Sequence, residues 1–278
     1  MKYKTIVKLL NELENNSVAP VRNKKLLLNY LKNDSVTFYV WECMPSKTTI
    51  DKDNQVFFDF DINIDDSINK SKFSRLIKVE RKFFALLNKY KLNYKFYIFT
   101  ADTNPSIMYP ESKVRYSSKQ LESLSRSFQK QLQKRADTLL DKNKAVVLRF
   151  SKIMNKYLPI YQKTFNQIYN DLSIDLYKNK WVNSRLSKQV IKHLSNHIDI
   201  PMDLKAELEE RACRYLASYA AEGMVFNMLN KIYKFKNLVW INNEIVGPSA
   251  AATELALKKT GQSGTPIIFY FYDKNCKL

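Results

Sequence analysis

The sequence predicts an α/β fold, with a mainly parallel sheet flanked by helices and an added helical layer. Short runs rich in β-branched and aromatic residues alternate along the chain with segments of helical periodicity. Such alternation is typical of strand–helix–strand units, which build parallel sheets. A long segment of helical character also separates the third expected strand from the fourth. No repeat, low-complexity tract or linker divides the 278 residues, so we expect one domain over 1–278, with a helical segment at about 117–200 inserted between strands.

The first half of the chain supplies three expected strands. The first thirty residues, ending in KKLLLNYLK, have the pattern of an amphipathic helix and a connection. β-branched and aromatic runs then predict strands at 36–42 (VTFYVWE), 55–62 (QVFFDFDI) and 95–101 (KFYIFTA). Between the last two, apolar residues at helical spacing predict a helix over 72–91.

The second half begins with helices and ends with strands. A strongly polar helix is expected at 117–142, with further helical stretches to about His197. Pro201 and the acidic residues that follow it indicate a new helix start, because Pro suits the first turn and acids suit the positive end of the helix dipole. The runs LVWINNE and TPIIFYFY predict two closing strands.

The charge and glycine content restrict the possible functions. The chain has 46 Lys and Arg against 27 acidic residues, a net charge of +19. A surplus of this size favours a polyanionic partner, first a nucleic acid and second an anionic membrane surface. Only four glycines occur, so a glycine-rich phosphate loop, and with it the usual nucleotide-binding enzymes, is disfavoured.

Cysteine usage and the amino-terminal sequence suggest a reduced, cytoplasmic compartment. The three cysteines are widely spaced and form no C-x-x-C pair. The apolar run in MKYKTIVKLL is too short for a signal peptide, and no run approaches a membrane span. His193 and His197 stand four residues apart, but no Glu lies between them as a metalloprotease helix requires, so no metal site is expected at these histidines.

One glutamate stands alone in an apolar helix. Glu222 lies in YLASYAAEGMVF, and the residues three, four and seven positions before it are Tyr219, Ser218 and Tyr215, all with hydroxyl groups. Helical geometry puts them on the face of Glu222. Burial would raise the pKa of such a carboxyl and hydrogen bonds to its charged form would lower it, so Glu222 is a candidate general acid or base. The alternative is a structural carboxylate satisfied by tyrosines or a lysine.

The polar helix at 117–142 carries a basic stripe. Arg126, Lys130 and Lys134 recur every four residues, with Lys119 and Arg135 beside them. Such a stripe can follow a phosphate backbone and bind it in a salt-dependent way. The alternative is a solvated helix face.

Two further groups lie on or after the early strands. Cys43 and Ser46, in ECMPSKT, follow the first strand, where α/β folds bind ligands and a nucleophile would meet its substrate. Asp59 and Asp61, in FFDFDI, share one face of a strand and could hold divalent metal ions for nucleotidyl transfer. An edge strand with one solvated face is the preferred explanation of the two aspartates.

In the order and spacing of these elements over about residues 34–272, the chain resembles the tRNA-dependent cyclodipeptide synthases. The matching pieces are VTFYVWECMPS, the helix at 72–91, YIFTADTNPS with Asp102, the basic stripe, and the run from Glu222 through EGMVFNMLNKIYKFKNLVWIN. YQKTFNQIYNDLSID also has the spacing of a family helix. The resemblance implies a Rossmann-like fold similar to the catalytic domains of class I aminoacyl-tRNA synthetases.

The resemblance further implies an aminoacyl transferase that joins two aminoacyl groups from tRNA into a cyclic dipeptide without ATP, metal or cofactor. The family motif G-x-S-P-x-N reads ECMPSK here, which leaves Cys43 or Ser46 as the nucleophile. Glu222 would relay protons, and Tyr215 or Tyr219 would orient the aminoacyl group. Ser218 replaces a family tyrosine.

Two positions after strands complete the implied site. Asp102 lies in the turn after the third strand, and Asn242 stands where the family's last loop begins with an aromatic pair. The resemblance implies substrate contacts for Ser218, Asp102 and Asn242, and tRNA contacts for the basic stripe. Aminoacyl-tRNA is thus the expected partner, with no membrane.

Two other functions remain open from the sequence. One is a primase-like, metal-dependent nucleotidyl transferase that uses Asp59 and Asp61. The other is a non-catalytic tRNA- or RNA-binding module of the same fold, which keeps the basic helix but not the nucleophile.

Overall fold

The computed structural model describes the following residues: 3–17, 20–33, 36–43, 46–50, 56–60, 83–101, 113–114, 117–139, 145–177, 213–214, 217–218, 221–222, 224–225, 237–241 and 267–268. The structure describes the backbone alone for Cys43 and for the strands at 46–50, 56–60, 113–114 and 267–268.

The helices and strands follow in this order: α1 Tyr3–Asn15, α2 Lys24–Lys32, β1 Val36–Cys43, β2 Ser46–Ile50, β3 Val56–Phe60, β4 Tyr94–Ala101, β5 Lys113–Val114, α6 Ser118–Leu139, β6 Ala145–Arg149, α7 Phe150–Tyr177, β7 Leu238–Ile241 and β8 Ile267–Ile268. Residues 83–89 are also helical, as are the described residues between 213 and 225.

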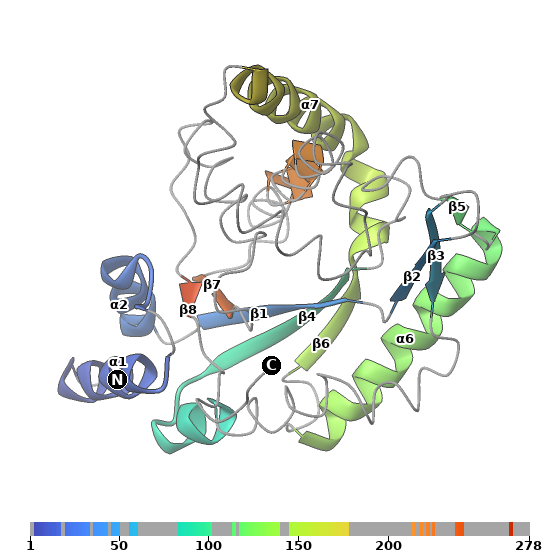
Figure 1. Ribbon diagram of the computed structural model, residues 1–278. Coiled ribbons are helices and arrows are strands. Elements are labelled where there is room, and N and C mark those ends of the chain that lie inside the picture. Colours follow the sequence, from blue (N-terminus) through green and yellow to red (C-terminus); the bar gives the residue numbers. More distant parts are fainter. Residues whose placement is uncertain are drawn as a thin grey trace.

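The main sheet has five parallel strands in the order β6-β4-β1-β7-β8 (Figure 1). From the central β1 the chain moves outward to β4 and β6, and then returns to β7 on the other side of β1. The predicted α/β fold with a parallel sheet is therefore confirmed. Because the connections leave β1 and β7 in opposite directions, the topological switch point of the sheet lies between these two strands.

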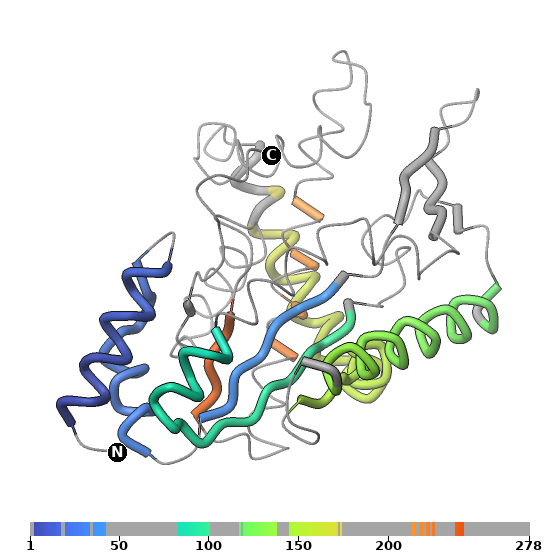
Figure 2. The backbone as a smooth tube through the Cα atoms, turned by 90° about the horizontal axis from the view of Figure 1, so that it is seen from below, coloured from blue at the N-terminus to red at the C-terminus, as the bar shows by residue number. Residues whose placement is uncertain are grey.

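Both faces of the sheet are covered, as parallel sheets require (Figure 2). On one face Phe38, Phe96 and Val147 pack with α1, α2, the helical residues 83–89 and α6. On the other face Tyr39 and Trp240 pack with α7 and with the helical residues near Glu222. The strands are apolar at successive positions for this reason, since both sides of each strand are buried.

The continuous helical segment expected at about 117–200 is wrong in one respect, because β6 interrupts it at Ala145–Arg149. The run AVVLR is only five residues long and stands in sequence between α6 and α7, so the helical pattern on both sides of it dominates. Ala145 and Val147 are buried in the core while Val146 is exposed.

A second, three-stranded sheet has the order β2-β3-β5. The expected strand at 55–62 is β3, which pairs antiparallel with β2, a strand that the sequence did not predict. The aspartate-containing run FFDFDI therefore does not extend the main sheet.

Side chains of α6 protect the edge of the main sheet at β6. The amide of Gln133 accepts a hydrogen bond from the Val147 N–H at 2.9 Å and donates one to the Ala145 carbonyl at 3.1 Å. Gln129 donates to the Val147 carbonyl at 2.8 Å. Gln133 thus satisfies β6 as a neighbouring strand would, which leaves these edge groups closed to pairing with another chain.

Candidate functional site

The switch point brings the ends of three strands together. Cys43 ends β1, Ala101 ends β4 as the register partner of Cys43, and Ile241 ends β7. Ligands of doubly wound sheets bind in the crevice beyond such strand ends. In sequence, Asp102 follows β4 and Asn242 follows β7, but both residues lie outside the described part of the chain.

Glu222 is buried. Its side chain is 9% exposed, and Ser218, one helical turn earlier, is 0% exposed. The neighbouring Ala221 belongs to the core cluster that also holds Tyr39 and Trp240, so this helix packs on the β1–β7 part of the sheet. A carboxyl in such surroundings is a group that could exchange protons with a substrate at the switch point.

A hydroxyl group beside Glu222 comes from Tyr161 of α7. Its Oη and the Oγ of Ser218 are 2.8 Å apart, and Tyr161 is 3% exposed. Burial raises the pKa of the Tyr161 hydroxyl, and the negative charge of Glu222 raises it further. Tyr161 is therefore a neutral phenol at physiological pH, able to donate a hydrogen bond.

Tyr215 and Tyr219, the hydroxyl neighbours of Glu222 that helical spacing predicts, both lie outside the described residues. Tyr161 was not among the predicted site residues. A signal was present, because Tyr161, Phe165 and Tyr169 recur every fourth residue, which predicts one aromatic face on a helix. Only the packing of α7 shows which helix that face meets.

This aromatic face is stacked along α7. The ring centroids of Tyr161 and Phe165 are 6.1 Å apart, and those of Phe165 and Tyr169 are 5.8 Å apart. The Arg214 guanidinium lies 5.2 Å from the Tyr169 ring centroid. The stack thus fixes α7 against the helical residues that carry Ser218 and Glu222.

A kink in α7 precedes Tyr161. Pro159 lies inside the helix, and Tyr157 has the non-helical angles φ −117° and ψ 21°. Proline lacks the N–H that would bond one turn back, and its ring crowds that carbonyl, so the helix bends at this point. The residues after the kink, including Tyr161, therefore run in a direction different from that of the first turn.

A polar row crosses the carboxyl end of the sheet. Glu42, Thr100 and Arg149 are register partners on β1, β4 and β6, and all three are buried. In strand alternation they share the face of Val40, Ile98 and Val147, which is the α6 face and not the Glu222 face. Among the described residues, Thr100 Oγ1 has no hydrogen-bond partner.

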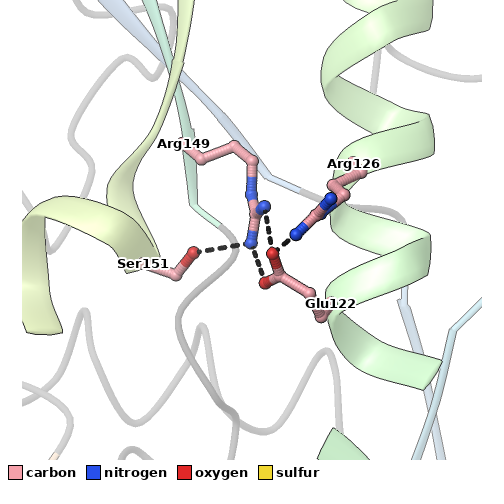
Figure 3. Close-up of polar contacts among 4 residues, drawn as sticks. All are labelled: Glu122, Arg126, Arg149 and Ser151. Carbon is pink, nitrogen blue, oxygen red and sulfur yellow. Dashed lines mark hydrogen bonds and ion pairs between the residues drawn. The ribbon is translucent and has the colours of Figure 1, made fainter. Parts of the chain in front are cut away.

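Arg149 joins this row to α6 (Figure 3). Its side chain is 2% exposed and forms a two-pronged ion pair with Glu122, including an Nη1–Oε1 hydrogen bond of 2.7 Å. Arg126 Nε also donates to Glu122 at 2.9 Å, and Arg149 donates to Ser151 at 3.2 Å. The hydrogen bonds from Arg149, and then from Arg126, lower the pKa of Glu122 to about 2.

The basic stripe lies on the outer face of α6. Lys119, Arg126, Lys130 and Lys134 are exposed and Arg135 is half-buried, while Phe128, Leu132 and Ala136 face the sheet. The opposite placement of charged and apolar residues is that of an amphipathic helix on a core. Arg126 differs from the lysines because it is bonded to Glu122.

The positions that could serve metal chemistry are not assembled in the described part of the chain. There, no group of three or more His, Cys, Asp or Glu side chains could hold a metal ion. The backbone of Asp59 pairs with Lys47 in the three-stranded sheet and not in the main sheet. Asp61, His193 and His197 lie outside the described residues. Within the described part, no helix is long and apolar enough to cross a membrane.

Comparisons with solved structures show a shared fold. A tyrosyl-tRNA synthetase from Archaeoglobus fulgidus, in complex with L-tyrosine, matches with a TM-score of 0.53 at 11% identity over 95% of this chain. A tyrosyl-tRNA synthetase from Leishmania major, in complex with tyrosinol, matches with a TM-score of 0.54 at 10% identity over 97% of this chain. The chain spans 64% and 36% of the lengths of these two proteins.

A cyclodipeptide synthase from Candidatus Glomeribacter gigasporarum, bound to Phe-tRNAPhe, is also similar. Its TM-score is 0.48 at 15% identity, over 93% of this chain and 96% of that one. Because this score is below 0.5, the fold assignment rests on the two tyrosyl-tRNA synthetases. No protein-family model matches the sequence, and no curated protein matches it.

Proposed function

We propose that this protein is an aminoacyl transferase that uses two aminoacyl-tRNAs to form a cyclic dipeptide through a covalent aminoacyl-enzyme. The observation that carries the proposal is the buried Glu222 beside the Ser218–Tyr161 hydrogen bond, on the helix packed against β1 and β7. The order of the sequence motifs supports it, as does the fold shared with tyrosyl-tRNA synthetases.

Cys43 is the proposed nucleophile. Tyr39 and Trp41 belong to the cluster on the Glu222 face of the sheet. Strand alternation gives Cys43, two residues after Trp41, the same face. Ser46 begins β2 and thus belongs to the other sheet. Alternation along β1 therefore supports Cys43 over Ser46 as the nucleophile.

The reaction begins with transfer to the thiol. The Cys43 sulfur attacks the ester carbonyl of the first aminoacyl-tRNA, so that a thioester forms and the tRNA hydroxyl leaves with the proton. The amine of the bound aminoacyl group then attacks the ester of the second aminoacyl-tRNA and displaces the second tRNA. The free amine of the resulting dipeptide attacks the thioester, which closes the ring and regenerates the thiol.

Glu222 acts as the proton acceptor for the attacking amine, since an ammonium group must lose a proton before it can attack. The Ser218–Tyr161 pair holds the hydroxyl groups around this carboxyl in one arrangement. The exposed Lys119, Lys130 and Lys134 bind the phosphate backbone of tRNA.

The experiment supplies total tRNA, amino acids, synthetases and ATP, and detects cyclic dipeptides and the acyl-enzyme by mass spectrometry. We expect product from the wild type and from Ser46→Ala, and neither product nor acyl-enzyme from Cys43→Ala. Loss of proton transfer in Glu222→Gln should reduce turnover by roughly 10²- to 10⁴-fold. Product from Cys43→Ala but not from Ser46→Ala would contradict the choice of nucleophile.

A non-catalytic RNA-binding module is the second candidate, favoured by one observation. The exposed lysines of α6 lie on the opposite side of that helix from the core, and their exposure does not depend on Glu222. Salt-sensitive tRNA binding without any acyl-enzyme or cyclic dipeptide, in the wild type and in Glu222→Gln alike, would support this function and exclude the transferase.

A further inference from the structure

Glu122 connects a buried arginine with an exposed one (Figure 3). Arg149, whose side chain is 2% exposed, binds both carboxylate oxygens of Glu122 and also donates to the Ser151 hydroxyl at 3.2 Å. From the other side, Arg126 Nε donates to Oε1 of the same carboxylate at 2.9 Å. Arg126 lies one turn after Glu122 on α6, and 65% of its side chain is exposed. We call Arg149, Glu122 and Arg126 the Arg–Glu–Arg triad.

The fold holds the Glu122 carboxylate in place. An exposed ion pair one helical turn apart contributes little by itself, because two long side chains must be confined to one conformation. Here the two-pronged contact with Arg149, at the end of β6, already confines the carboxylate. Hydrogen bonds from Arg149 and then Arg126 lower the pKa of Glu122 to about 2, so the carboxylate is charged at physiological pH. Only the Arg126 side chain then needs to be ordered, and Glu122 gives its Nε–H a fixed acceptor.

The triad keeps a net positive charge, and Arg126 exposes it. Two guanidinium groups share one carboxylate, and a guanidinium is always protonated. Glu122 compensates the charge of the buried Arg149, which would be costly to leave unpaired. Within the described part of the chain, Arg126 bonds to Glu122 through Nε alone, so its two terminal nitrogens have no hydrogen-bond partner there. Arg126 can therefore bind an anion without giving up Glu122.

The lysines of the basic stripe have no such support. Lys130 and Lys134 follow Arg126 at successive turns of α6 and are exposed, and neither forms an ion pair with a described residue. An ammonium group meets a phosphate as a point charge, whereas a guanidinium presents a planar fork that matches two phosphate oxygens. Holding the fork in place before binding reduces the entropy lost on binding. Arg126 is thus the position in the basic stripe where one phosphate can be bound in a defined geometry.

We propose that Glu122 is a positioning residue for tRNA: held by Arg149, it orients Arg126 so that the terminal guanidinium nitrogens bind one backbone phosphate in a two-pronged contact. The inference rests on the proposed binding of tRNA by α6 and not on the acyl transfer. It gives an acidic residue on a basic surface a favourable role in binding an anion. Charge alone predicts the opposite, because a carboxylate on this surface repels phosphate.

The test is a double-mutant cycle on tRNA affinity. Fluorescence anisotropy of fluorescein-labelled total tRNA measures Kd over a series of KCl concentrations for the wild type, Arg126→Lys, Glu122→Gln and the double variant. In the wild-type background, Arg126→Lys should weaken binding about tenfold, the loss of a charge-assisted hydrogen bond. The slope of log affinity against log salt concentration should stay the same, because lysine keeps the positive charge.

The Glu122→Gln background should remove most of this difference. There, Arg126→Lys should weaken binding less than about threefold, because Arg126 is no longer oriented and the two positions are coupled. Glu122→Gln alone should also weaken binding, whereas the loss of a negative charge by itself would strengthen it. A role of Glu122 in stability alone would not make the effect of Arg126→Lys depend on residue 122.

A second variant allows for the chance that Glu122→Gln unfolds the protein by leaving Arg149 without a charged partner. Glu122→Asp keeps the charge but shortens the side chain by one methylene group, so the advantage of arginine at position 126 should again fall. Circular dichroism verifies the fold of each variant. The matched control is Lys130→Arg, one turn further along the stripe, whose effect on affinity should be the same with Glu, Gln or Asp at position 122.

The possible results separate the inference from the proposed function. Equal affinities of the wild type and Arg126→Lys would overturn the two-pronged contact. An equal loss from Arg126→Lys with Glu, Gln or Asp at position 122 would show that Glu122 does not position Arg126. The expected coupling in a protein that forms no acyl-enzyme would support this inference and remove the transferase. A wild type without salt-sensitive tRNA binding would overturn both.

Discussion

The hydrogen bond between Tyr161 and Ser218 allows a quantitative test of the site's architecture. Both side chains are almost fully buried, and their oxygens are 2.8 Å apart. Tyr161→Phe leaves the Ser218 hydroxyl buried without this partner, and Ser218→Ala does the same to the phenol. Each single change should lower the free energy of unfolding by about 1–3 kcal/mol, the cost of leaving a buried polar group unsatisfied.

The double variant should cost less than the two single changes together. With both hydroxyls absent, no buried polar atom of the pair needs a partner, and replacing both members of a hydrogen bond by apolar groups can be nearly neutral. We therefore expect a coupling free energy of at least about 2 kcal/mol between the two positions, at the upper end of the range for residues in contact.

Urea unfolding of the four proteins measures this coupling. Their m-values should agree, so that differences in midpoint report stability alone. Ser173→Ala serves as the control, because the Ser173 hydroxyl bonds a carbonyl of its own helix at 2.8 Å and is only half-buried. Its effect should be below about 1 kcal/mol. Strictly additive effects of Tyr161→Phe and Ser218→Ala would refute the hydrogen bond and, with it, this description of the site.

Three further outcomes follow from the fold. The pKa of Glu122 is lowered from 4.5 to about 2, so its ion pair with Arg149 should stabilise the fold fully above pH 4.5 and be lost as the pH falls toward 2. Acid titrations monitored by circular dichroism should show that Glu122→Gln lacks this part of the pH dependence of stability. An acid profile unchanged by the substitution would count against the ion pair. Gln133→Leu should lower the free energy of unfolding by about 1–3 kcal/mol, because the backbone groups of β6 that Gln133 bonds would face an apolar side chain. Aggregation on heating should increase. Equal stability of the variant and the wild type would show that Gln133 does not protect this edge. Reversing the charge of Lys130 and Lys134 should reduce the slope of log affinity for tRNA against log salt concentration by roughly 0.7–0.9 for each phosphate that α6 no longer neutralises. As the control, two charge reversals of lysines on the exposed side of α1 should leave this slope unchanged. Equal effects from both helices would indicate non-specific attraction.

Prediction from sequence succeeded where the local sequence pattern agrees with the burial of the residues in the fold. The runs VTFYVWE and KFYIFTA are confirmed as β1 and β4, because β-branched and aromatic residues fit strands that are buried on both faces. The polar helix is confirmed as α6, whose core residues recur at helical spacing. For β6 the same reasoning failed, since five residues are too few to show a period and the edge of the sheet has a different pattern of exposure.

Partners distant in sequence could not be predicted in this way. Helical spacing identified Ser218 as a neighbour of Glu222, but the tyrosine that bonds Ser218 lies 57 residues away on α7. Nor does the sequence indicate that Glu42, Thr100 and Arg149 form one row, because register depends on the pairing of three strands. Tyr215, Tyr219, Asp102 and Asn242 stay predictions.

The sequence by itself determined four features: the fold class, the positive charge, the outer basic face of α6 and the isolation of Glu222 in an apolar helix. Each of them depends on residue type and on spacing along one element of the chain. Tertiary structure decided which strand ends flank the switch point and that Tyr161 meets Ser218. It also decided that aromatic rings fill the face of the sheet to which Tyr39, Trp41 and Phe99 belong. These features depend on strand order, on register and on the contact of distant helices, and packing of the whole chain fixes them because no local sequence preference can.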